Sequence, residues 1–327
     1  MKLVVIGLGS MGRRRIRLIQ RLHPQWKICA VDISEERRIF VESEFHVQVF
    51  EDLKSVFKEF RPAAALVCTS PLGHGSVVLD CLNAGLHVFT ELNLVSNWYA
   101  EAEAIAKKKG LKIFVSSTFL FRKELQYIAK AVNGRRVNYI YHSGQYLPDW
   151  HPWESYKNFF VSDKRTNACR EILAIELPWM VRAFGEIQSI YVLTDRNSGL
   201  DIDFNDNYII SIQHVSGNKG VFCQDIVSRC GLRRLEVYSE DLHLFWDGTP
   251  QTLSVWNVKS KKMTPVQIYK NVEQDGKYNS NIIENMYMDE LKAFFGYISG
   301  HITPLYTLED DRKTLSLIDL IEKGGVK

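Results

Sequence analysis

Short apolar runs alternate with amphipathic stretches along the first third of the chain. The apolar runs predict strands at about residues 2–9, 27–33, 47–50, 64–70, 87–92 and 112–117, and the amphipathic stretches predict helices at 11–22, 35–44, 51–59, 74–84 and 97–109. This alternation is typical of a parallel sheet covered by helices. We therefore predict a doubly wound α/β domain over residues 1–118.

The pattern changes after residue 118. We predict a helix at 122–133, a strand at 137–145, a helix at 170–184, consecutive strands between 188 and 270, and helices at 284–299 and 308–324. Runs of strands with few helices between them favour an antiparallel sheet. The prediction for the whole chain is an α/β fold. It has an N-terminal Rossmann sheet and, over 119–327, an α+β domain with a large open, mostly antiparallel sheet.

Composition and charge exclude several classes of protein. The chain has 327 residues, 46% of them hydrophobic, and a net charge of +3, so nothing demands a nucleic acid or an anionic membrane. Its six cysteines show no CxxC spacing, which indicates buried thiols rather than disulfides or a metal site. No apolar stretch approaches the ~20 residues that span a bilayer. We expect a cytoplasmic protein.

A glycine-rich turn follows the first predicted strand, in "VVIGLGSMGRRR". Gly7 allows a tight turn, Gly9 lets the backbone approach a pyrophosphate, and Gly12 lets helix and strand pack closely. The start of the next helix offers free N–H groups to an anion. We expect the turn, with Ser10 and Met11, to bind a dinucleotide.

The second predicted strand ends in Asp32, at the spacing expected of an acid that binds a ribose 2′-hydroxyl. Its alternative role is to cap the helix at 35–44. Arg37 and Arg38 lie where they would meet a 2′-phosphate, and Arg13 lies where it would meet the pyrophosphate or adenine. A solvated helix face is the alternative for these arginines. NAD is favoured, and NADP stays open.

The stretch "CTSPLGHGSVVLDCLNAGLHVFTELNL", residues 68–94, resembles the family of glucose–fructose oxidoreductase, inositol dehydrogenase and MocA, which are NAD(P)-dependent sugar oxidoreductases. The resemblance extends over nearly the whole chain, including "REILAIELPWMVRAFGE" and the final helices. It implies a Rossmann domain and a substrate domain whose open sheet forms a homodimer or homotetramer. The loop "YLPDWHPWESYKNFFVS" resembles a bacterial branch that acts in surface-glycan and sugar-nucleotide metabolism.

The resemblance also assigns roles along the cofactor. It implies that Thr69, Ser70, Pro71 and His74 line the path toward the nicotinamide, and that Glu91 lies under the nicotinamide ribose. Packing on the turn at the start of a helix is the alternative for His74.

Two sites depart from the family's pattern. The usual Glu-Lys-Pro triplet is replaced by an acid followed by Leu92 and Asn93, so the lysine that helps to move the proton is missing. On the helix at 170–184, Glu171 stands at the usual aspartate, and Ile175 stands at the usual histidine. Hydride transfer from an alcohol needs a proton acceptor, and both usual acceptors are absent.

Three residues are candidates for the missing acid–base group. Glu171 and Glu176 lie five apart, about 140° around a helix, so at most one of them points straight into a site. Burial of Glu176 in "ILAIELPW" would raise its pKa; its alternative is a buried carboxylate satisfied by an arginine or a backbone amide. His151 is the third candidate.

The long loop before this helix is rich in aromatic and basic residues. Aromatic faces stack on sugar rings, and arginine clamps carboxylates or phosphates. Long loops in compact domains tend to be functional, although this one would also fit a lid packed on itself. The predicted substrate-binding residues are Trp150, Trp153, Tyr156, Arg165, Asn167 and Arg170.

The leading hypothesis is an NAD(P)-dependent oxidoreductase acting on a sugar, sugar acid or nucleotide-linked sugar. The alternative is a redox-inactive family member that binds a dinucleotide or sugar and acts as a sensor or partner subunit. A third reading is a permanently bound cofactor that serves elimination or epimerisation without net oxidation.

Overall fold

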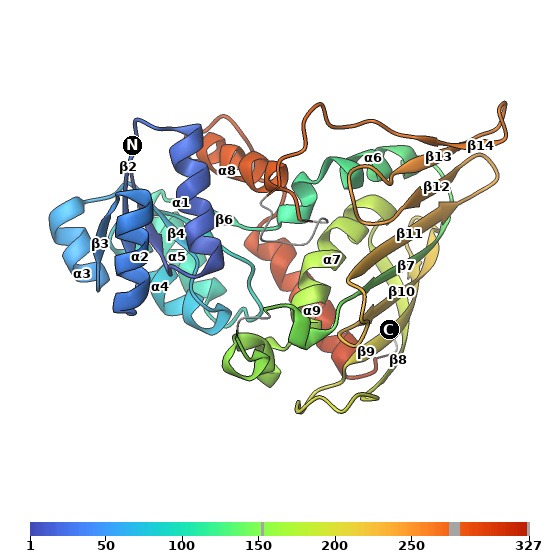
Figure 1. The fold of residues 1–327 in the computed structure, drawn as a ribbon, viewed down its shortest axis with the longest axis horizontal. Coiled ribbons are helices and arrows are strands. Elements are labelled where there is room, and N and C mark those ends of the chain that lie inside the picture. The colour runs from blue at the N-terminus through green and yellow to red at the C-terminus, as the bar shows by residue number, and fades with distance from the viewer. Residues whose placement is uncertain (152–153, 275–281, 326–327) are drawn as a thin grey trace. The chain divides into compact units, whose positions relative to one another are not determined.

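The computed structural model describes residues 1–151, 154–274 and 282–325 (Figure 1). They form two compact units. Unit 1 comprises Met1–Ser117 and Tyr287–Arg312, and unit 2 comprises Thr118–Met286 and Lys313–Lys327. The sequence-based division placed everything after residue 118 in the second domain, whereas the segment Tyr287–Arg312 clusters with the first unit.

Unit 1 contains a six-stranded parallel sheet in the order β3-β2-β1-β4-β5-β6. The strands are β1 (Lys2–Ile6), β2 (Lys27–Val31), β3 (Gln48–Phe50), β4 (Ala64–Val67), β5 (His87–Thr90) and β6 (Ile113–Val115). The helices are α1 (Ser10–Leu22), α2 (Glu35–Phe45), α3 (Leu53–Ser55) with the π-helical turn η1 (Val56–Phe60), α4 (His74–Asn83) and α5 (Tyr99–Lys109). The predicted doubly wound sheet is confirmed.

The central strands of this sheet are buried on both faces, which explains their unbroken apolar sequences. Every residue of β4 is buried, as are all of β1 after Lys2. The predicted strands ran too far at their carboxyl ends because the apolar pattern continues into residues that form the turns there. Those turns carry the cofactor motifs.

Unit 2 is built on an eight-stranded sheet in the order β14-β13-β12-β11-β7-β10-β9-β8. Its strands are β7 (Asn138–Gly144), β8 (Ile187–Asp195), β9 (Asn207–His214), β10 (Lys219–Asp225), β11 (Leu232–Tyr238), β12 (His243–Trp246), β13 (Ser254–Asn257) and β14 (Lys262–Pro265). β7 and β10 pair in parallel and the other neighbours are antiparallel. The mostly antiparallel sheet is confirmed.

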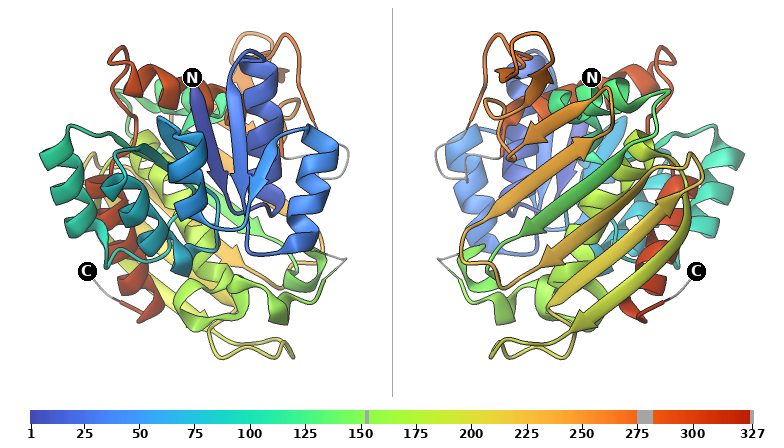
Figure 2. Two further views of the ribbon diagram at one scale, coloured as in Figure 1. Left: turned by 90° about the vertical axis from the view of Figure 1, so that its left-hand side faces the viewer. Right: turned by 90° about the vertical axis from the view of Figure 1, so that its right-hand side faces the viewer.

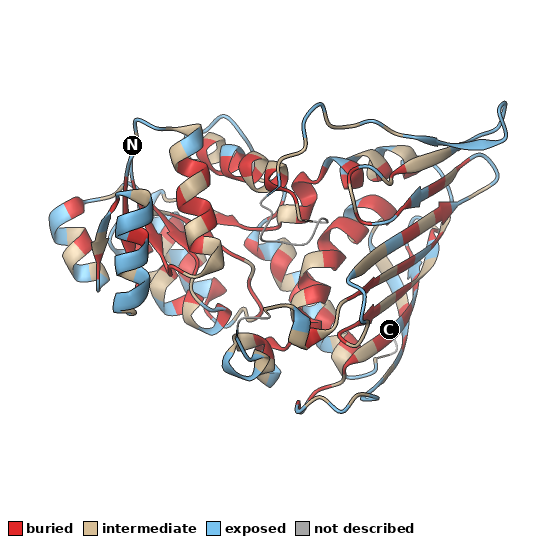
Figure 3. Cartoon of the chain, in the orientation of Figure 1, coloured by how far each residue is buried: buried red, intermediate tan, exposed pale blue. Residues whose placement is uncertain are grey.

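One face of this sheet is covered by helices and the other is bare (Figures 1 and 2). α6 (Lys123–Val132) and α7 (Ala168–Phe184) belong to this unit, while α8 (Glu284–Ile298) and α9 (Leu308–Glu322) run across the unit boundaries. On the covered face the rings of Tyr139 and Phe184 stack at 4.0 Å. Along the strands of this sheet, buried residues alternate with exposed ones (Figure 3). On the bare face Tyr191 is 63% exposed and Leu193 is 65% exposed.

None of the helices within the described ranges is both long enough and apolar enough to cross a membrane.

Candidate cofactor and acid–base sites

The glycine turn of unit 1 has the geometry that its spacing predicted. Gly7 has a φ of +90°, and a β-carbon at Gly12 would lie 1.9 Å from the Gly7 carbonyl oxygen, so both positions require glycine. A β-carbon at Gly9 would meet nothing within 4 Å. Ser10 and Met11 form the first turn of α1, which has no side-chain cap. The turn therefore leaves room for an anion beside an uncapped helix start.

Asp32 follows β2 and is 7% exposed. Its carboxylate accepts hydrogen bonds from the backbone N–H of Leu8, at 2.7 Å, and of Ser34, at 2.9 Å. The cap of α2 is Ser34, whose hydroxyl accepts from the N–H of Arg37. Helix capping, the alternative role for Asp32, therefore falls to Ser34, and ribose binding by Asp32 stays a prediction.

The three arginines near this end of the sheet differ in their surroundings. The Arg38 guanidinium donates to the carbonyls of Asp32 and Ile33, and Arg13 lies over the Phe40 ring at 5.1 Å. The Arg37 side chain is 56% exposed, with its Nη1 3.6 Å from Asp32 Oδ2. Arg37 is therefore the most solvent-accessible candidate partner for a 2′-phosphate.

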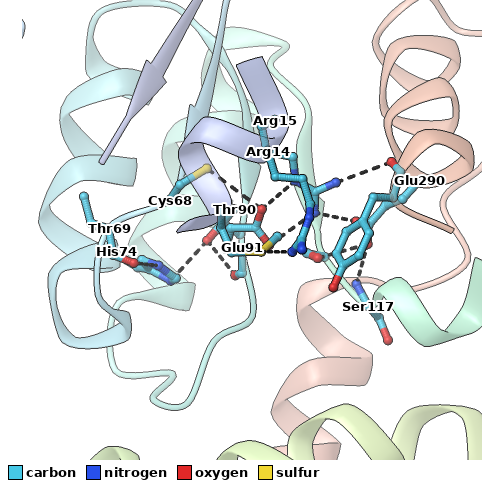
Figure 4. A network of polar contacts seen from close by, with 12 residues as sticks. Arg14, Arg15, Cys68, Thr69, His74, Thr90, Glu91, Ser117 and Glu290 are labelled. Atoms are coloured by element: carbon cyan, nitrogen blue, oxygen red, sulfur yellow. Dashed lines mark hydrogen bonds and ion pairs between the residues drawn. The ribbon is translucent and has the colours of Figure 1, made fainter. Parts of the chain in front are cut away.

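His74 links the turns that follow β4 and β5 (Figure 4). It is 1% exposed, with Nε2 2.8 Å from the Thr69 carbonyl and Nδ1 2.8 Å from Asn93 Oδ1. Burial lowers the pKa of His74. These bonds give His74 the packing role that was its alternative, and Asn93 braces the turn where the family has proline. Ser70 is exposed and Pro71 is buried beneath it.

Glu91, directly after β5, belongs to a buried charge cluster (Figure 4). Arg15 Nε lies 2.6 Å from Glu91 Oε1, and Arg15 Nη2 lies 3.2 Å from Glu91 Oε2 and 2.6 Å from Glu290 Oε2. Burial opposes the charge of Arg15, but the two carboxylates outweigh it and raise the arginine's pKa. Burial also raises the pKa of Glu290. The sequence reasoning missed both Arg15 and Glu290.

Unit 2 contains a separate, polar-lined cavity of about 150 Å³. It lies between the start of α7, the C-terminal end of β7 and the N-terminal end of β11. Its lining residues are Ser143, Gly144, Gln145, Trp150, Glu171, Ile172, Ile175, Leu232 and Arg233. Glu171 and Ile175, the two positions where the family carries its aspartate and histidine, therefore line one pocket.

Glu171 is the carboxyl group that lines this cavity. Its Oε2 is buried and has no hydrogen-bond partner within the described residues. Burial raises the pKa of Glu171 to about 7. A carboxyl group with a pKa near neutrality can both accept and donate a proton at physiological pH, which is the requirement for a general acid–base catalyst.

Glu176, the other candidate carboxyl, is fully buried beneath the sheet. Its oxygens accept hydrogen bonds from Arg233 Nε at 2.8 Å, Tyr141 Oη at 2.8 Å and Trp179 Nε1 at 2.6 Å. It does not line the cavity. The structure thus gives Glu176 its alternative role, a carboxylate satisfied by an arginine, and we no longer assign it a catalytic one.

His151, the third candidate base, lies outside the cavity lining. Its Nδ1 is 2.8 Å from Glu154 Oε1, and its ring lies 4.6 Å from the ring of Phe159. His151 therefore packs within its own loop.

Only one of the described substrate-binding candidates, Trp150, lines the cavity. Trp153 lies outside the described residues. The Tyr156 hydroxyl accepts from the N–H of Asp201 at 3.2 Å. The loop thus contributes Trp150 to the cavity lining, while Tyr156 ties the loop to the segment between β8 and β9.

Two of the remaining three candidates, Asn167 and Arg170, stabilise the start of α7. Asn167 is the N-cap, accepting from the N–H of Arg170 at 2.8 Å. The Arg170 guanidinium pairs with Glu322 at 2.6 Å and Asp319 at 2.8 Å. Arg165 is 67% exposed and pairs with its neighbour Asp163. These contacts correct the substrate-binding assignment, because the polar groups of Asn167 and Arg170 are engaged within the fold.

The sequence reasoning also missed the polar cavity residues that come from strands. Ser143 lies near the end of β7, Gln145 follows that strand, and Arg233 lies on β11. The adjacent arginines 233 and 234 were the available signal, because successive residues of a strand face opposite sides of a sheet. Arg233 is thereby turned inward, and its side chain is only 17% exposed.

Comparison with known proteins relates a part of the chain to oxidoreductases. Residues 1–117 match the family model described as "Oxidoreductase family, NAD-binding Rossmann fold". A 4-carboxy-2-hydroxymuconate-6-semialdehyde dehydrogenase from a Sphingobium species is 26% identical over 132 residues, which is 39% of this chain. The match covers 42% of that relative's length.

Solved structures share the fold over 99% of the chain. An Agrobacterium radiobacter oxidoreductase, solved with NAD⁺, L-tartaric acid and magnesium, is 12% identical with a TM-score of 0.81 and 96% of its chain covered. The UDP-N-acetylglucosamine 3-dehydrogenase GnnA from Acidithiobacillus ferrooxidans is 15% identical, with a TM-score of 0.77 and 97% covered. The Chromobacterium violaceum WlbA dehydrogenase, solved with NADH and UDP-GlcNAcA, is 13% identical, with a TM-score of 0.76 and 93% covered.

These matches agree with the glycine turn, the acid after β2 and the six-stranded parallel sheet. Residues 1–117 are therefore similar to the NAD-binding Rossmann domain of the oxidoreductase family that includes glucose–fructose oxidoreductase, inositol dehydrogenase and MocA.

Proposed function

We propose that this protein is an NAD(P)-dependent oxidoreductase, with NAD favoured, that acts on a sugar, sugar acid or nucleotide-linked sugar. The observation that carries the proposal is Glu171, a buried carboxyl group with one unpartnered oxygen and a pKa of about 7, beside a cavity in unit 2. Perturbed carboxyl groups of this kind mark functional sites.

The residues of unit 1 fit a dinucleotide. Gly9 leaves open space at the uncapped start of α1, where a pyrophosphate would bind. The Asp32 carboxylate lies at the end of the neighbouring strand, where it would accept hydrogen bonds from ribose hydroxyls. The bound cofactor would supply or accept the hydride at nicotinamide C4.

Glu171 would take the proton that leaves a substrate hydroxyl during oxidation and return it during reduction. The hydrophobic neighbours Ile172 and Ile175 keep water from its carboxyl group and so maintain its raised pKa. Ile175 itself cannot move a proton. Glu171 therefore replaces, one helical turn earlier, the base that is missing at Ile175.

A carbohydrate substrate is supported by the cavity lining and by proteins of the same fold. The Trp150 ring offers an aromatic face for a sugar ring, and Ser143 and Gln145 offer hydrogen-bonding groups. The structural relatives that act on UDP-N-acetylglucosamine or bind UDP-GlcNAcA favour a nucleotide-linked sugar. A role in bacterial surface-glycan metabolism would follow from such a substrate.

The test measures turnover by absorbance at the nicotinamide wavelength. In the oxidation direction, UDP-sugars, free sugars and sugar acids are each assayed with NAD⁺ and with NADP⁺. In the reduction direction, the matching keto sugars are assayed with the reduced cofactors. We expect turnover with at least one substrate, and its loss in Glu171→Gln at unchanged cofactor affinity. Glu186→Gln is the matched control, because Glu186 is an exposed carboxylate just beyond the same helix. Full activity in Glu171→Gln would refute the assigned role.

The alternative function, a dinucleotide-binding protein without redox chemistry, is favoured by Leu92 and Ile175. It predicts that the cofactor binds but that no substrate in the panel changes the absorbance. The third reading, a redox relay for elimination or epimerisation, predicts product formation without net change in absorbance, which chromatography of the sugar would detect.

A homodimer or homotetramer is supported by the bare face of the eight-stranded sheet. Large apolar side chains on this face are exposed, including Ile140, Tyr191, Leu193 and Trp256. Neighbouring strands bring these side chains onto one surface, and extended exposed apolar patches mark protein interfaces. We propose that a second copy of the chain covers this face.

A further inference from the structure

Arg15, Glu91 and Glu290 form a buried charge cluster that the proposed chemistry does not use (Figure 4). Arg15 lies on α1, one turn after Gly12, whereas Glu91 follows β5 and Glu290 lies on α8. The side chains of Arg15 and Glu290 are 0% exposed. A single buried guanidinium therefore contacts two carboxylates from distant parts of the sequence.

Arg15 donates one hydrogen bond to each carboxylate oxygen of Glu91: Nε lies 2.6 Å from Oε1, and Nη2 lies 3.2 Å from Oε2. A planar fork of this kind fixes both the position and the plane of the carboxylate. A carboxylate offers about four acceptor positions, and the Cys68 thiol, at 3.9 Å, is a further weak donor. The Glu91 side chain is still 10% exposed, so it can accept a hydrogen bond from an incoming hydroxyl.

Glu290 is the second carboxylate that pairs with the guanidinium of Arg15. Its Oε2 lies 2.6 Å from Arg15 Nη2, while its Oε1 accepts from the Ser116 hydroxyl and the Ser117 N–H, both at 2.9 Å. The two serines follow β6 directly. Arg15 is thus immobilised between the ends of β5 and β6, and α8 supplies a part of unit 1 that residues 1–117 lack.

The location of the cluster indicates what it serves. In a Rossmann sheet, the carboxyl ends of the strands on the β4, β5 side receive the second mononucleotide half of a dinucleotide. The residue after Glu91 is Leu92, which brings no charge to balance it. We propose that Arg15, oriented by Glu290, is a positioning residue that fixes Glu91 as the acceptor for the ribose hydroxyls on the nicotinamide side. This inference rests on the proposed dinucleotide binding.

The test compares two ligands on the full chain. NADH carries the nicotinamide ribose, and ADP carries only the adenosine half and the phosphates. Arg15→Lys keeps the charge but loses the fork, so we expect the Kd of NADH to rise about tenfold, as for the loss of a charged hydrogen bond, while the Kd of ADP changes by less than about twofold. Arg21→Lys, an exposed position on the same helix, is the control and should change neither Kd.

A second variant covers the case in which Arg15→Lys does not fold. Glu290→Gln keeps an oxygen for Ser117 but weakens the hold on Arg15, and it should also raise the Kd of NADH selectively. Equal losses for both ligands, or unchanged NADH binding, would overturn the positioning role. A wild-type protein that binds ADP but not NADH would instead overturn the dinucleotide proposal itself, and the inference with it.

Discussion

Replacing Glu171 by glutamine should stabilise the protein at neutral and alkaline pH while removing its activity. Burial raises the pKa of Glu171 from an ordinary 4.5 to about 7, because the carboxylate form is desolvated and Oε2 has no partner in the described structure. The folded state therefore binds its proton more tightly than the unfolded state does. Stability consequently falls as pH rises from the unfolded pKa through the folded one.

The size of the effect follows from the two pKa values. A pKa difference of one corresponds to about 1.4 kcal/mol, so the gap between 4.5 and about 7 sets a ceiling of about 3 kcal/mol at pH values above 7. Glutamine has a similar shape and never ionises. The free energy of unfolding of Glu171→Gln should therefore match the wild type at about pH 4 and exceed it by up to about 3 kcal/mol at about pH 8.

Urea unfolding followed by tryptophan fluorescence, at several pH values across this range, measures the difference. Trp150 and Trp179 lie in the same unit as Glu171 and report on its unfolding. Glu186→Gln, at an exposed position, is the control and should show no such pH-dependent gain. A Glu171→Gln variant whose advantage does not grow between about pH 4.5 and about pH 7 would refute the buried, unpaired state of this carboxyl group.

Four further substitutions test other parts of the structure. Gly9→Ala should weaken NADH binding about tenfold or more and leave the melting temperature unchanged, because its methyl group meets open space. Gly12→Ala should weaken NADH binding and also lower the melting temperature, because its β-carbon would lie 1.9 Å from a carbonyl oxygen. Asn167→Ala should lower the free energy of unfolding in urea by about 1 kcal/mol, because the helix cap is lost. A changed KM with an unchanged free energy of unfolding would instead indicate that Asn167 binds substrate. Leu193→Asp should shift the mass measured by light scattering to that of a monomer. An unchanged mass would show that the bare sheet face is not the interface between copies of the chain.

The fold of unit 1 could be predicted because its sequence signals are local. Strands buried on both faces read as continuous apolar runs, and the spacing of Gly7, Gly9 and Gly12 encodes contacts between residues only a few positions apart. The exception is the segment Tyr287–Arg312. Its place in unit 1 depends on packing across the whole chain, which no local pattern carries.

The roles of the buried charges could not be predicted, because their partners come from distant segments. Glu171 and Glu176 both lie in an apolar helical stretch. Glu176 meets three hydrogen-bond donors, two of which come from β7 and β11, whereas Glu171 Oε2 meets none among the described residues. Arg15 and Glu290 are 275 positions apart. One signal was available in the sequence. Helical periodicity places Arg15 on the same side of α1 as Gly12 and Ile19, and this side is buried.

Asn167 and Arg170 illustrate a different failure. Residue type predicted ligand binding, because amides and guanidinium groups in a long loop are suited to it. These same groups also cap helix ends and pair with carboxylates of the same fold, and the structure uses them in that way. Only the positions of their partners, on α7 itself and on α9, decide between the two uses.

Binding of the reduced cofactor tests the central claim most directly, because every proposed role depends on it. Titration of the protein with NADH and with NADPH, followed by nicotinamide fluorescence, should show saturable binding of NADH and weaker binding of NADPH. Failure of both cofactors to bind would contradict the assignment as an NAD(P)-dependent oxidoreductase.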